Sequence, residues 1–532
     1  MPLPSALAPL RHRAFRMLWL ANLCSNTGMW MQNTGAGWLM TSLAPSPLMV
    51  SLVQVASLLP VFLLGLPAGA LADIIDRRLF LILAQAWIAA SGTLLAVLTY
   101  AGLLGPWGLI ALTFAIGAGT AMNFPGWAAT TPELVPRKDL TQAIVLNGIG
   151  FNLTRAVGPA LGGFTIAALG AEANFALNAV SFVAVIVALL AWRRRPERSR
   201  LPKEHFFQAM RTGVGFVRAA PVMRAAIIRG CVFFGFSAAI WGLLPLLVRN
   251  QLGLGPEWFG LMLGAMGTGA VAAGFLLPSL RARVERGPMV TGSTILAGLV
   301  LVLLGQAGHP AVAILCMLLF GVAWIAGAST LQASAQFASP AWVRARSIGI
   351  YQLMTFGALA LGSGLGGWAG ETLGLPQALA LFGGCGAAAA LLVRRLSLEP
   401  PAAPGPNTGA IPAPAPAAAD LAPLLLGESG RVLEAVRYHI APGDRGAFLL
   451  AMAECRQVRL RSGALAWRLY EDVAKPERWV ELWAVESWTE HLREADRLTE
   501  WDRAALARAA ALHRGETPPA ASRYLNVQPP GV

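Results

Sequence analysis

Residues 46–78 read SPLMVSLVQVASLLPVFLLGLPAGALADIIDRR, an apolar stretch of membrane-spanning length that ends in a pair of arginines. A helix needs about 20 mostly apolar residues to cross the hydrocarbon core of a bilayer. The chain up to Leu396 contains twelve such blocks, centred near Ala21, Leu58, Ala89, Ala115, Phe151, Val183, Phe236, Ala265, Ile295, Met317, Phe356 and Ala387. The sequence therefore predicts twelve transmembrane helices.

The basic residues of this region lie in alternate gaps between the blocks. One set of gaps holds nearly all of them, in groups that begin at Arg11, Arg77, Arg137, Arg281, Arg344 and Arg394, together with the run from Arg193 to Arg229. The other set contains only Arg249. Because short cytoplasmic loops are enriched in Lys and Arg, we expect a multi-pass protein of the cell inner membrane with both ends of the membrane region in the cytoplasm.

The composition supports this interpretation and excludes others. With 56% hydrophobic residues the chain of 532 is too apolar for an ordinary soluble protein. The net charge of +14 belongs to the membrane part and its inner loops, since the tail after Glu399 is nearly neutral. We therefore expect the lipid bilayer as a partner and no nucleic acid. The five scattered cysteines show no metal-type spacing, and no cofactor is expected.

The longest inner gap divides the blocks into six and six. The motif GPALGG at Gly158–Gly163 returns as GSGLGG at Gly362–Gly367, 204 residues later. Such equivalence is typical of membrane proteins built from two parallel repeats. We predict an all-α membrane part with a six-helix bundle at 1–192, a cytoplasmic connector at 193–221 and a second six-helix bundle at 222–396.

The tail has a different composition. A Pro/Ala-rich linker is predicted at 397–428. Residues 429–532 read as strands at 432–440, 466–473, 478–487 and 522–527, with a helix at 444–461 and one long helix from Ser487 to Ala511. The order β-α-β-β-α-β predicts a cytoplasmic α+β ferredoxin-like module.

The loop between the second and third blocks resembles a signature of the major facilitator superfamily, which combines a Gly, a Leu, an Asp and a basic cluster. The resemblance implies two six-helix bundles and a gating role for the arginines, which would contact the neighbouring bundle in the inside-closed state. A topology signal with a helix cap is the alternative. The common Gly before the basic pair is Asp here. The candidate residues are Gly69, Asp73, Asp76, Arg77 and Arg78.

A second signature, in the fifth block, resembles the Gly-Pro motif of exporters in this superfamily. Its glycines allow close helix approach and its proline can kink the helix. Its Arg155 is the only clearly intramembrane basic residue, and a charge at mid-span costs about 2.5–3.5 kcal/mol on insertion scales. Function is therefore the first hypothesis for Arg155 and a buried structural pairing the alternative. The motif consists of Asn152, Arg155, Gly158, Pro159, Gly162 and Gly163.

Neutral polar and aromatic residues in several blocks could line a central substrate cavity. Trp30 and Phe236 would contribute aromatic surface. Hydrogen bonds that join helices are the alternative role for the amides. The candidates are Asn26, Asn33, Gln54, Asn123, Trp127, Trp241, Gln332, Gln336, Tyr351 and Gln352.

Coupling to a proton or another ion is implied by the resemblance alone. Proton relays in membranes usually need a carboxylate or a histidine. No Asp or Glu lies securely at the middle of a block, so Asp73, Glu133 and Asp139 are only peripheral candidates.

The resemblance extends to the enterobactin-exporter-like branch and its transmembrane secretion effector members. It rests on Phe15-Arg16-x-Leu18-Trp19, on SNTGMWMQNTGAGWLM at 25–40 and on SWTEH at 487–491. It implies a secondary transporter that exports an amphipathic small molecule such as a siderophore, a macrolide or a drug-like compound. An importer of the same fold remains an alternative. The chain has no P-loop for nucleotide, so direct ATP drive is not expected.

The tail leaves a further alternative, a membrane-tethered enzyme. A pocket of this kind would use His439, His491, Trp467, Tyr470 and Trp483. Strand aromatics are more often core or a dimer face. We therefore expect no enzyme, and a regulatory or dimerising module instead.

Overall fold

The computed structural model describes residues 5–192, 206–340, 342–399, 431–498 and 500–526. Its contacts divide the chain into two compact units. The first consists of Met1–Pro202, Ala226–Ser334 and Tyr351–Leu398. The second consists of Lys203–Ala225, Ala335–Ile350 and Glu399–Val532. The predicted linker at 397–428 lies almost wholly outside the described residues.

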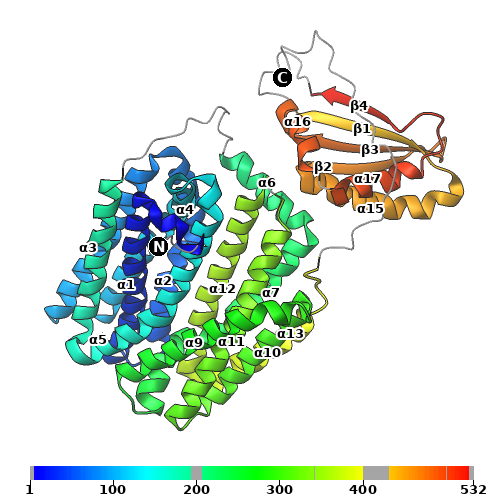
Figure 1. Ribbon diagram of the computed structural model, residues 1–532. Coiled ribbons are helices and arrows are strands. Elements are labelled where there is room, and N and C mark those ends of the chain that lie inside the picture. Colours follow the sequence, from blue (N-terminus) through cyan, green and yellow to red (C-terminus); the bar gives the residue numbers. More distant parts are fainter. Residues whose placement is uncertain (1–4, 193–205, 341, 400–430, 499, 527–532) are drawn as a thin grey trace. The chain divides into compact units, whose positions relative to one another are not determined.

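Long helices, drawn from blue to yellow in Figure 1, make up the first unit. The predicted connector forms one helix at Phe206–Ala219, α6, which belongs to the second unit. The other helices are α1 (Arg13–Leu43), α2 (Pro47–Ile74), α3 (Arg77–Tyr100), α4 (Pro106–Leu134), α5 (Leu140–Ala191), α7 (Pro221–Ser237), α8 (Ala239–Leu246), α9 (Pro256–Arg281), α10 (Arg286–Gly305), α11 (Pro310–Phe337), α12 (Arg344–Leu373) and α13 (Leu375–Val393). A short π-helical segment, η3 (Leu247–Gln251), continues α8.

Nine helical stretches of the described residues are long and apolar enough to cross a membrane. One of them, Arg137–Ala191, contains a break at Gly170. Helices α1 and α4 are of spanning length but are not among the nine. In α1 the amides of Asn22, Asn26 and Asn33 reduce the apolar content. The total of twelve transmembrane helices therefore stays a prediction.

Two glycines turn the chain sharply between consecutive helices. Gly170 divides α5 at φ 87° and ψ 169°, and Gly374 separates α12 from α13 at φ 88° and ψ 159°. A side chain would be strained at this positive φ, which glycine adopts freely. The two positions are 204 residues apart, the offset of the repeated Gly motif. The backbone therefore repeats where the sequence repeats.

The outer surfaces of the helices expose large apolar side chains. Phe275 is 83% exposed, and Leu361 and Val180 are also among the most exposed. Exposed apolar surface of this extent marks a contact with lipid or protein rather than with water. Backbone polar groups in such surroundings must be satisfied internally, which continuous helices achieve.

The C-terminal module contains a four-stranded antiparallel sheet in the order β2-β3-β1-β4. The strands are β1 (Val432–His439), β2 (Ala466–Glu471), β3 (Arg478–Val485) and β4 (Ala520–Leu525). Helix α15 (Arg445–Ser462) follows β1, and two helices separate β3 from β4. Phe448 and Met452 of α15 pack against Trp479 and Trp483 of β3 in the core.

The prediction of one long helix at Ser487–Ala511 is wrong. Two helices, α16 (Trp488–Arg497) and α17 (Glu500–Ala511), occupy this stretch. Ser487 caps α16 by accepting a hydrogen bond from the Glu490 backbone, as its capping-box pattern predicts. The break follows from Leu498, whose extended backbone (φ −71°, ψ 121°) ends α16. This bend gives α16 and α17 separate directions on the module.

The core of the module buries charged side chains together with apolar ones. Glu481 of β3 is fully buried and accepts hydrogen bonds from Arg459 Nε at 3.2 Å and Trp467 Nε1 at 3.0 Å. Arg459 also donates to Glu494 Oε1 at 3.2 Å, and its guanidinium lies 3.6 Å from the centre of the Trp483 ring. Burial lowers the pKa of Arg459, but the Glu481 and Glu494 carboxylates raise it above its ordinary value. Arg459 is thus a fixed positive charge.

Replacing Arg459 with methionine should destabilise the module. The variant leaves two buried carboxylates without their shared cation, and breaking a buried pair in this way costs about 3–5 kcal/mol. Hydrogen exchange of the β1 and β3 amides in the full-length protein should show this loss of protection. The matched control is Arg503→Met, at an exposed position of α17, which should change protection by less than about 0.5 kcal/mol. Equal protection in the two variants would contradict the role assigned to Arg459.

Candidate functional site

Aromatic side chains from both halves of the helical unit form a continuous cluster. Trp30 of α1 lies 6.4 Å from Trp241 of α8, measured between ring centres. Trp241 lies 5.7 Å from Trp324 of α11 in an edge-to-face arrangement. Trp324 in turn contacts Phe233 and Phe234 of α7, at 5.7 Å and 5.3 Å. The cluster therefore joins α1 of the first half to three helices of the second half.

The sequence predicts part of this cluster. Trp30 and Trp241, which were both predicted to contribute aromatic surface, lie next to each other, and a shared cavity stays a prediction. Phe236 instead packs against Phe382 of α13 at 5.9 Å. Trp324 was not a candidate, because a tryptophan in an apolar block carries no local sign of its partners. Its recognition requires the fold.

The amide candidates have separate surroundings. Asn26 and Asn33 flank Trp30 on α1 and are half-buried, as are Gln54 of α2, Gln332 of α11 and Gln352 of α12. Among the described residues, no hydrogen bond joins these amides to one another. Gln336 is exposed and belongs to the second unit.

The remaining candidates lie against single neighbouring helices. Asn123 of α4 accepts a hydrogen bond from Gln85 Nε2 of α3 at 3.1 Å, which is the helix-joining role. The indole nitrogen of Trp127 is buried and has no hydrogen-bond partner in the part of the chain that the structure describes. Tyr351 is buried on α12, where its ring lies beside Gly230 of α7.

The span-five motif lies where three helices meet. A Cβ on Gly158 would come within 2.6 Å of the Trp30 Cβ, so α5 contacts α1 without intervening side chains. A Cβ on Gly162 would lie 2.9 Å from the Met31 Cα. On the next face a Cβ on Gly163 would lie 2.8 Å from the Cα of Gly260 in α9, which belongs to the other half. The motif therefore allows α5 to pack closely on both halves.

Arg155 lies one helical turn before Pro159 on α5. It is half-buried, and within the described ranges its guanidinium has neither a hydrogen-bond nor an ion-pair partner. Asn152, one turn earlier, donates to the Gly148 carbonyl oxygen at 2.9 Å. The structural pairing that was the alternative for Arg155 is therefore not found among the described residues, and a functional role stays a prediction.

The arginines of the predicted gating loop bind partners in their own half. Asp76 caps α3 by accepting from the Leu79 backbone at 3.1 Å. Arg77 pairs with Glu133 of α4 at 2.7 Å. Arg78 donates to the carbonyl oxygens of Leu189 and Leu190 at the end of α5, at 2.8 Å and 2.6 Å. These contacts are not the predicted cross-bundle ones, because the free carbonyls of a helix end attract the nearest cation.

Two other members of that loop motif, Gly69 and Asp73, lie in α2. The surroundings of Gly69 and of the Asp73 side chain fall outside what the structure describes.

A polar seam between α1 and α5 was missed from the sequence. Asn174 Nδ2 donates to the Met31 carbonyl oxygen at 2.7 Å, and Asn178 donates to the side chain of Gln32. Gln32, Asn174 and Asn178 are all nearly inaccessible. The spacing of two asparagines four residues apart in an apolar block is the signal that could have found this seam.

Arg229 is a second residue that differs from expectation. It was counted in the inner basic run, yet it is 2% exposed on α7. Its guanidinium donates to the Gly287 carbonyl at 2.5 Å, to Thr291 Oγ1 at 2.6 Å and to the Leu396 carbonyl at 3.2 Å. Arg229 therefore joins α7 to α10 and to the end of α13, and Arg155 is not the only arginine buried among helices.

Hydrogen bonds also link the two halves on the side predicted to face outward. Arg249 of η3 donates to Thr41 Oγ1 at 2.8 Å and to Ser42 Oγ at 2.5 Å, both at the end of α1. Ser46, the cap of α2, donates to Glu371 of α12 at 2.6 Å. The arginine that stood alone in the outer gaps is thus a contact between the halves.

The profile of the transmembrane secretion effector family matches residues 4–530. The chain is 29% identical to an uncharacterized MFS-type transporter of Bacillus subtilis, over 42% of this chain and 54% of that protein. The match therefore spans about half the length of that relative. The chain is 24% identical to a staphyloferrin A transporter of Staphylococcus aureus (56% and 74% covered) and 25% identical to an enterobactin exporter of Escherichia coli (60% and 76%).

Solved structures share the helical fold at low identity. A POT family transporter in complex with 5-aminolevulinic acid superposes with a TM-score of 0.61, at 13% identity, over 72% of this chain and 95% of that one. A bacterial homologue of the human lysosomal transporter Spinster gives 0.57 at 14% identity, over 74% and 98%. The chain therefore belongs to the transmembrane secretion effector family of the major facilitator superfamily, whose members are membrane transporters and not enzymes.

Proposed function

We propose that this protein exports an amphipathic organic molecule, such as a siderophore, a macrolide or a drug-like compound, along a path between its two six-helix halves. The observation that carries the proposal is the aromatic cluster that joins Trp30 of one half to Trp241 and Trp324 of the other. Aromatic faces bind apolar parts of a ligand, and Asn26 and Asn33 beside Trp30 offer hydrogen bonds to its polar parts. The siderophore and macrolide transporters among the relatives agree with this class of substrate.

We propose a twelve-span topology with both ends in the cytoplasm and an inner-membrane location. Helix α5 has 52 residues and would measure about 78 Å if straight, more than twice a bilayer core of about 30 Å. Its break at Gly170 makes it two spans. The nine apolar stretches, the helices α1 and α4, and the additional span made by the division of α5 together give twelve spans. The alternation of the basic gaps supports the orientation.

We propose that transport works by alternating access between the bundles at 1–192 and 222–396. Arg249 and Glu371 hold the halves together on the proposed outer side. The inner arginines Arg77 and Arg78 bind within their own half in this state. This arrangement supports a state that is closed outside, and the Arg77 and Arg78 contacts would be exchanged for cross-bundle ones when the inside closes.

Coupling to a proton or another ion would use the inner rim. Glu133 is paired with Arg77, and Asp139 is paired with His12 at 2.8 Å. Carboxylates in such pairs can exchange a cation partner for a proton when the helices move. These pairs are the candidates that the described residues offer for ion coupling.

The C-terminal module is proposed to be a ferredoxin-like domain at 429–532 with a regulatory or dimerising role. Its strand order β2-β3-β1-β4 and antiparallel pairing support this topology, apart from the extra helix between β3 and β4. Tyr470 and Tyr524 are about half exposed on the two edge strands and supply aromatic surface for a second copy. The linker at 397–428 would attach the domain to the membrane part.

Export can be tested in everted membrane vesicles, with Arg155→Ala as the discriminating variant. Energised vesicles with the natural protein should accumulate a labelled macrolide or siderophore, since their inner face is outward. Loss of the charge should reduce the initial rate roughly 10- to 100-fold, the effect of removing a hydrogen bond or ion contact of about 1.5–3 kcal/mol. Arg155→Lys should retain part of the rate. Thr165→Ala, on an exposed part of α5, is the control.

Two outcomes would contradict this proposal. Accumulation only in right-side-out vesicles would indicate an importer. If the Arg155→Ala variant transported at the rate of the natural protein, with equal membrane insertion, Arg155 would have only a packing role. Metabolite profiling of the medium with and without the gene would identify the compound itself.

The outward-side contact predicts a shift in conformation. Arg249→Met removes two hydrogen bonds from a charged donor, each worth about 1.5 kcal/mol or more, and should favour opening to the outside. A reporter cysteine at Asn33, with the natural cysteines replaced, should react roughly 10-fold faster with an impermeant maleimide. Arg283→Met, an exposed arginine of the predicted inner set, is the matched control. Equal labelling of both variants would exclude an outer gate at Arg249.

Deletion of the C-terminal module should leave transport largely intact. Ending the chain after Pro400 removes the sheet and its three helices but no helix of the bundles. Separate domains generally keep their own cores when divided at a linker. Vesicle uptake and membrane insertion of the truncated protein should match the full-length protein, and failure to insert would argue against a separate module.

A further inference from the structure

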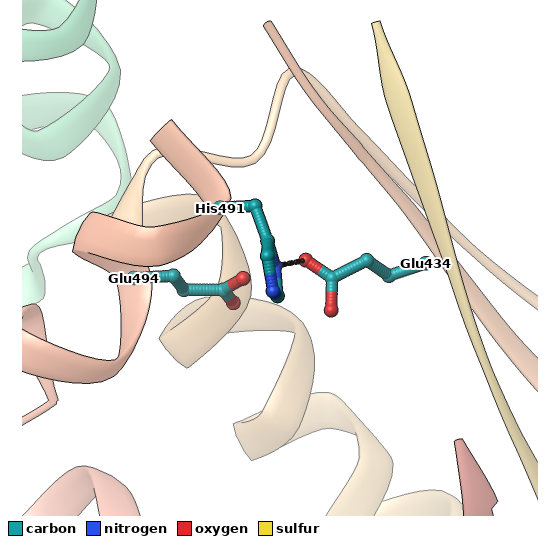
Figure 2. Close-up of side chains that lie close together, drawn as sticks. All are labelled: Glu434, His491 and Glu494. Atoms are coloured by element: carbon teal, nitrogen blue, oxygen red, sulfur yellow. Dashed lines mark hydrogen bonds and ion pairs between the residues drawn. The ribbon is translucent and has the colours of Figure 1, made fainter. Parts of the chain in front are cut away.

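Three side chains of ligand type converge in the core of the C-terminal module. They are Glu434 of β1 and His491 and Glu494 of α16, which are 7%, 7% and 5% exposed. One donor atom from each lies within 4.8 Å of the other two. Figure 2 shows the imidazole between the two carboxylates, which approach it from the strand on one side and from the helix on the other.

The local structure explains why these groups meet. His491 and Glu494 are three residues apart on α16, so they lie on one face of the helix. The cap at Ser487 fixes the start of that helix. Glu434 lies on the same face of β1 as Val432 and Val436, whose side chains lie in the core of the module. The sequence signal is His-x-x-Glu in a capped helix, a spacing also used by helical carboxylate metal sites.

Neighbouring groups hold the donors in place. Glu494 accepts from Arg459 Nη1 at 3.2 Å and from Trp483 Nε1 at 3.3 Å. His491 Nδ1 is 2.5 Å from Glu434 Oε1, while no described residue makes a hydrogen bond to its Nε2. Metal-binding carboxylates and histidines are usually oriented by such outer hydrogen bonds. The donors are therefore fixed before any ion arrives.

The charges around the cluster do not balance. Three buried carboxylates, Glu434, Glu481 and Glu494, face two guanidinium groups. Arg459 binds two of the carboxylates, and Arg523 of β4 lies 3.7 Å from Glu434. When the His491 imidazole is neutral, one negative charge is in surplus, and a buried charge is costly unless a proton or a cation accompanies it.

The pKa of Glu494 reflects this surplus. Burial, and then the charge of Glu434, raise the pKa of Glu494 to about 7 against the opposing effect of Arg459.

We propose that Glu434, His491 and Glu494 bind one divalent transition-metal ion of the zinc class. One imidazole and two carboxylates suit Zn²⁺ and its neighbours Co²⁺ and Mn²⁺. The imidazole disfavours Ca²⁺ and Mg²⁺, which prefer all-oxygen sites. Absence of sulfur from the donor set disfavours Cu⁺. The site gives the module a ligand of its own.

Metal binding by the full-length protein tests the site directly. Protein purified in detergent, freed of its tag and stripped with EDTA, is titrated with Zn²⁺ alone and with Co²⁺ alone. We expect one Zn²⁺ per chain by elemental analysis after gel filtration, and visible Co²⁺ absorption bands. His491→Gln and Glu494→Gln should each weaken Zn²⁺ binding by more than the roughly 10- to 100-fold typical of outer residues.

The matched control is Glu490→Gln on the same helix, at a carboxylate that pairs with Arg497 rather than with the cluster. Its Zn²⁺ affinity and Co²⁺ spectrum should match the natural protein. Hydrogen exchange of β1 verifies that each variant is folded. If His491→Gln is not folded, His491→Asn is used in its place. Failure of the natural protein to bind Zn²⁺ or Co²⁺ would overturn the proposal and leave a site for a proton only. Unchanged binding in both cluster variants would overturn it equally.

Discussion

The hydrocarbon of a bilayer offers no hydrogen-bond partner, and the helical unit is built around that constraint. Several of its buried polar groups bond to one another across helices, as Asn174 Nδ2 does with the Met31 carbonyl. Arg229 binds two backbone carbonyls and a threonine, so its charge is covered without an acidic partner. Arg155 also lies among packed helices, and no described group partners its charge.

The two halves repeat the same contacts. In the first, α5 contacts α1 through Gly158 and reaches across to α9 through Gly163. In the second, α12 contacts α7 through Gly362 and reaches across to α2 through Gly367. Because the motif and the turn glycines Gly170 and Gly374 share one offset, each half presents the same close-packed helix to its partner. Small residues at both crossings allow the helix backbones to approach closely.

The sequence predicted what depends on local patterns. Apolar blocks, the cap at Ser487 and the strands of the module are set by neighbours within a few residues, and the structure has them. Partner choice depends on distant residues and was less predictable. Gly163 was recognised as a packing glycine, but nothing local identifies Gly260 as its partner. Arg77 and Arg78 were expected to cross between bundles, yet Glu133 and the end of α5 are nearer. The long helix at 487–511 failed because Leu498 adopts an extended backbone that its charge pattern does not reveal.

Candidate sites in both units follow one physical rule. In the module, Arg459 lies between Glu481 and Glu494, and that part of the network is satisfied. Glu434 and His491 extend the network beyond the available positive charge, and the remainder needs a proton or a metal ion. In the membrane part, Arg155 is a positive charge for which the described residues supply no anion, so each place holds a charge that its neighbouring side chains do not balance.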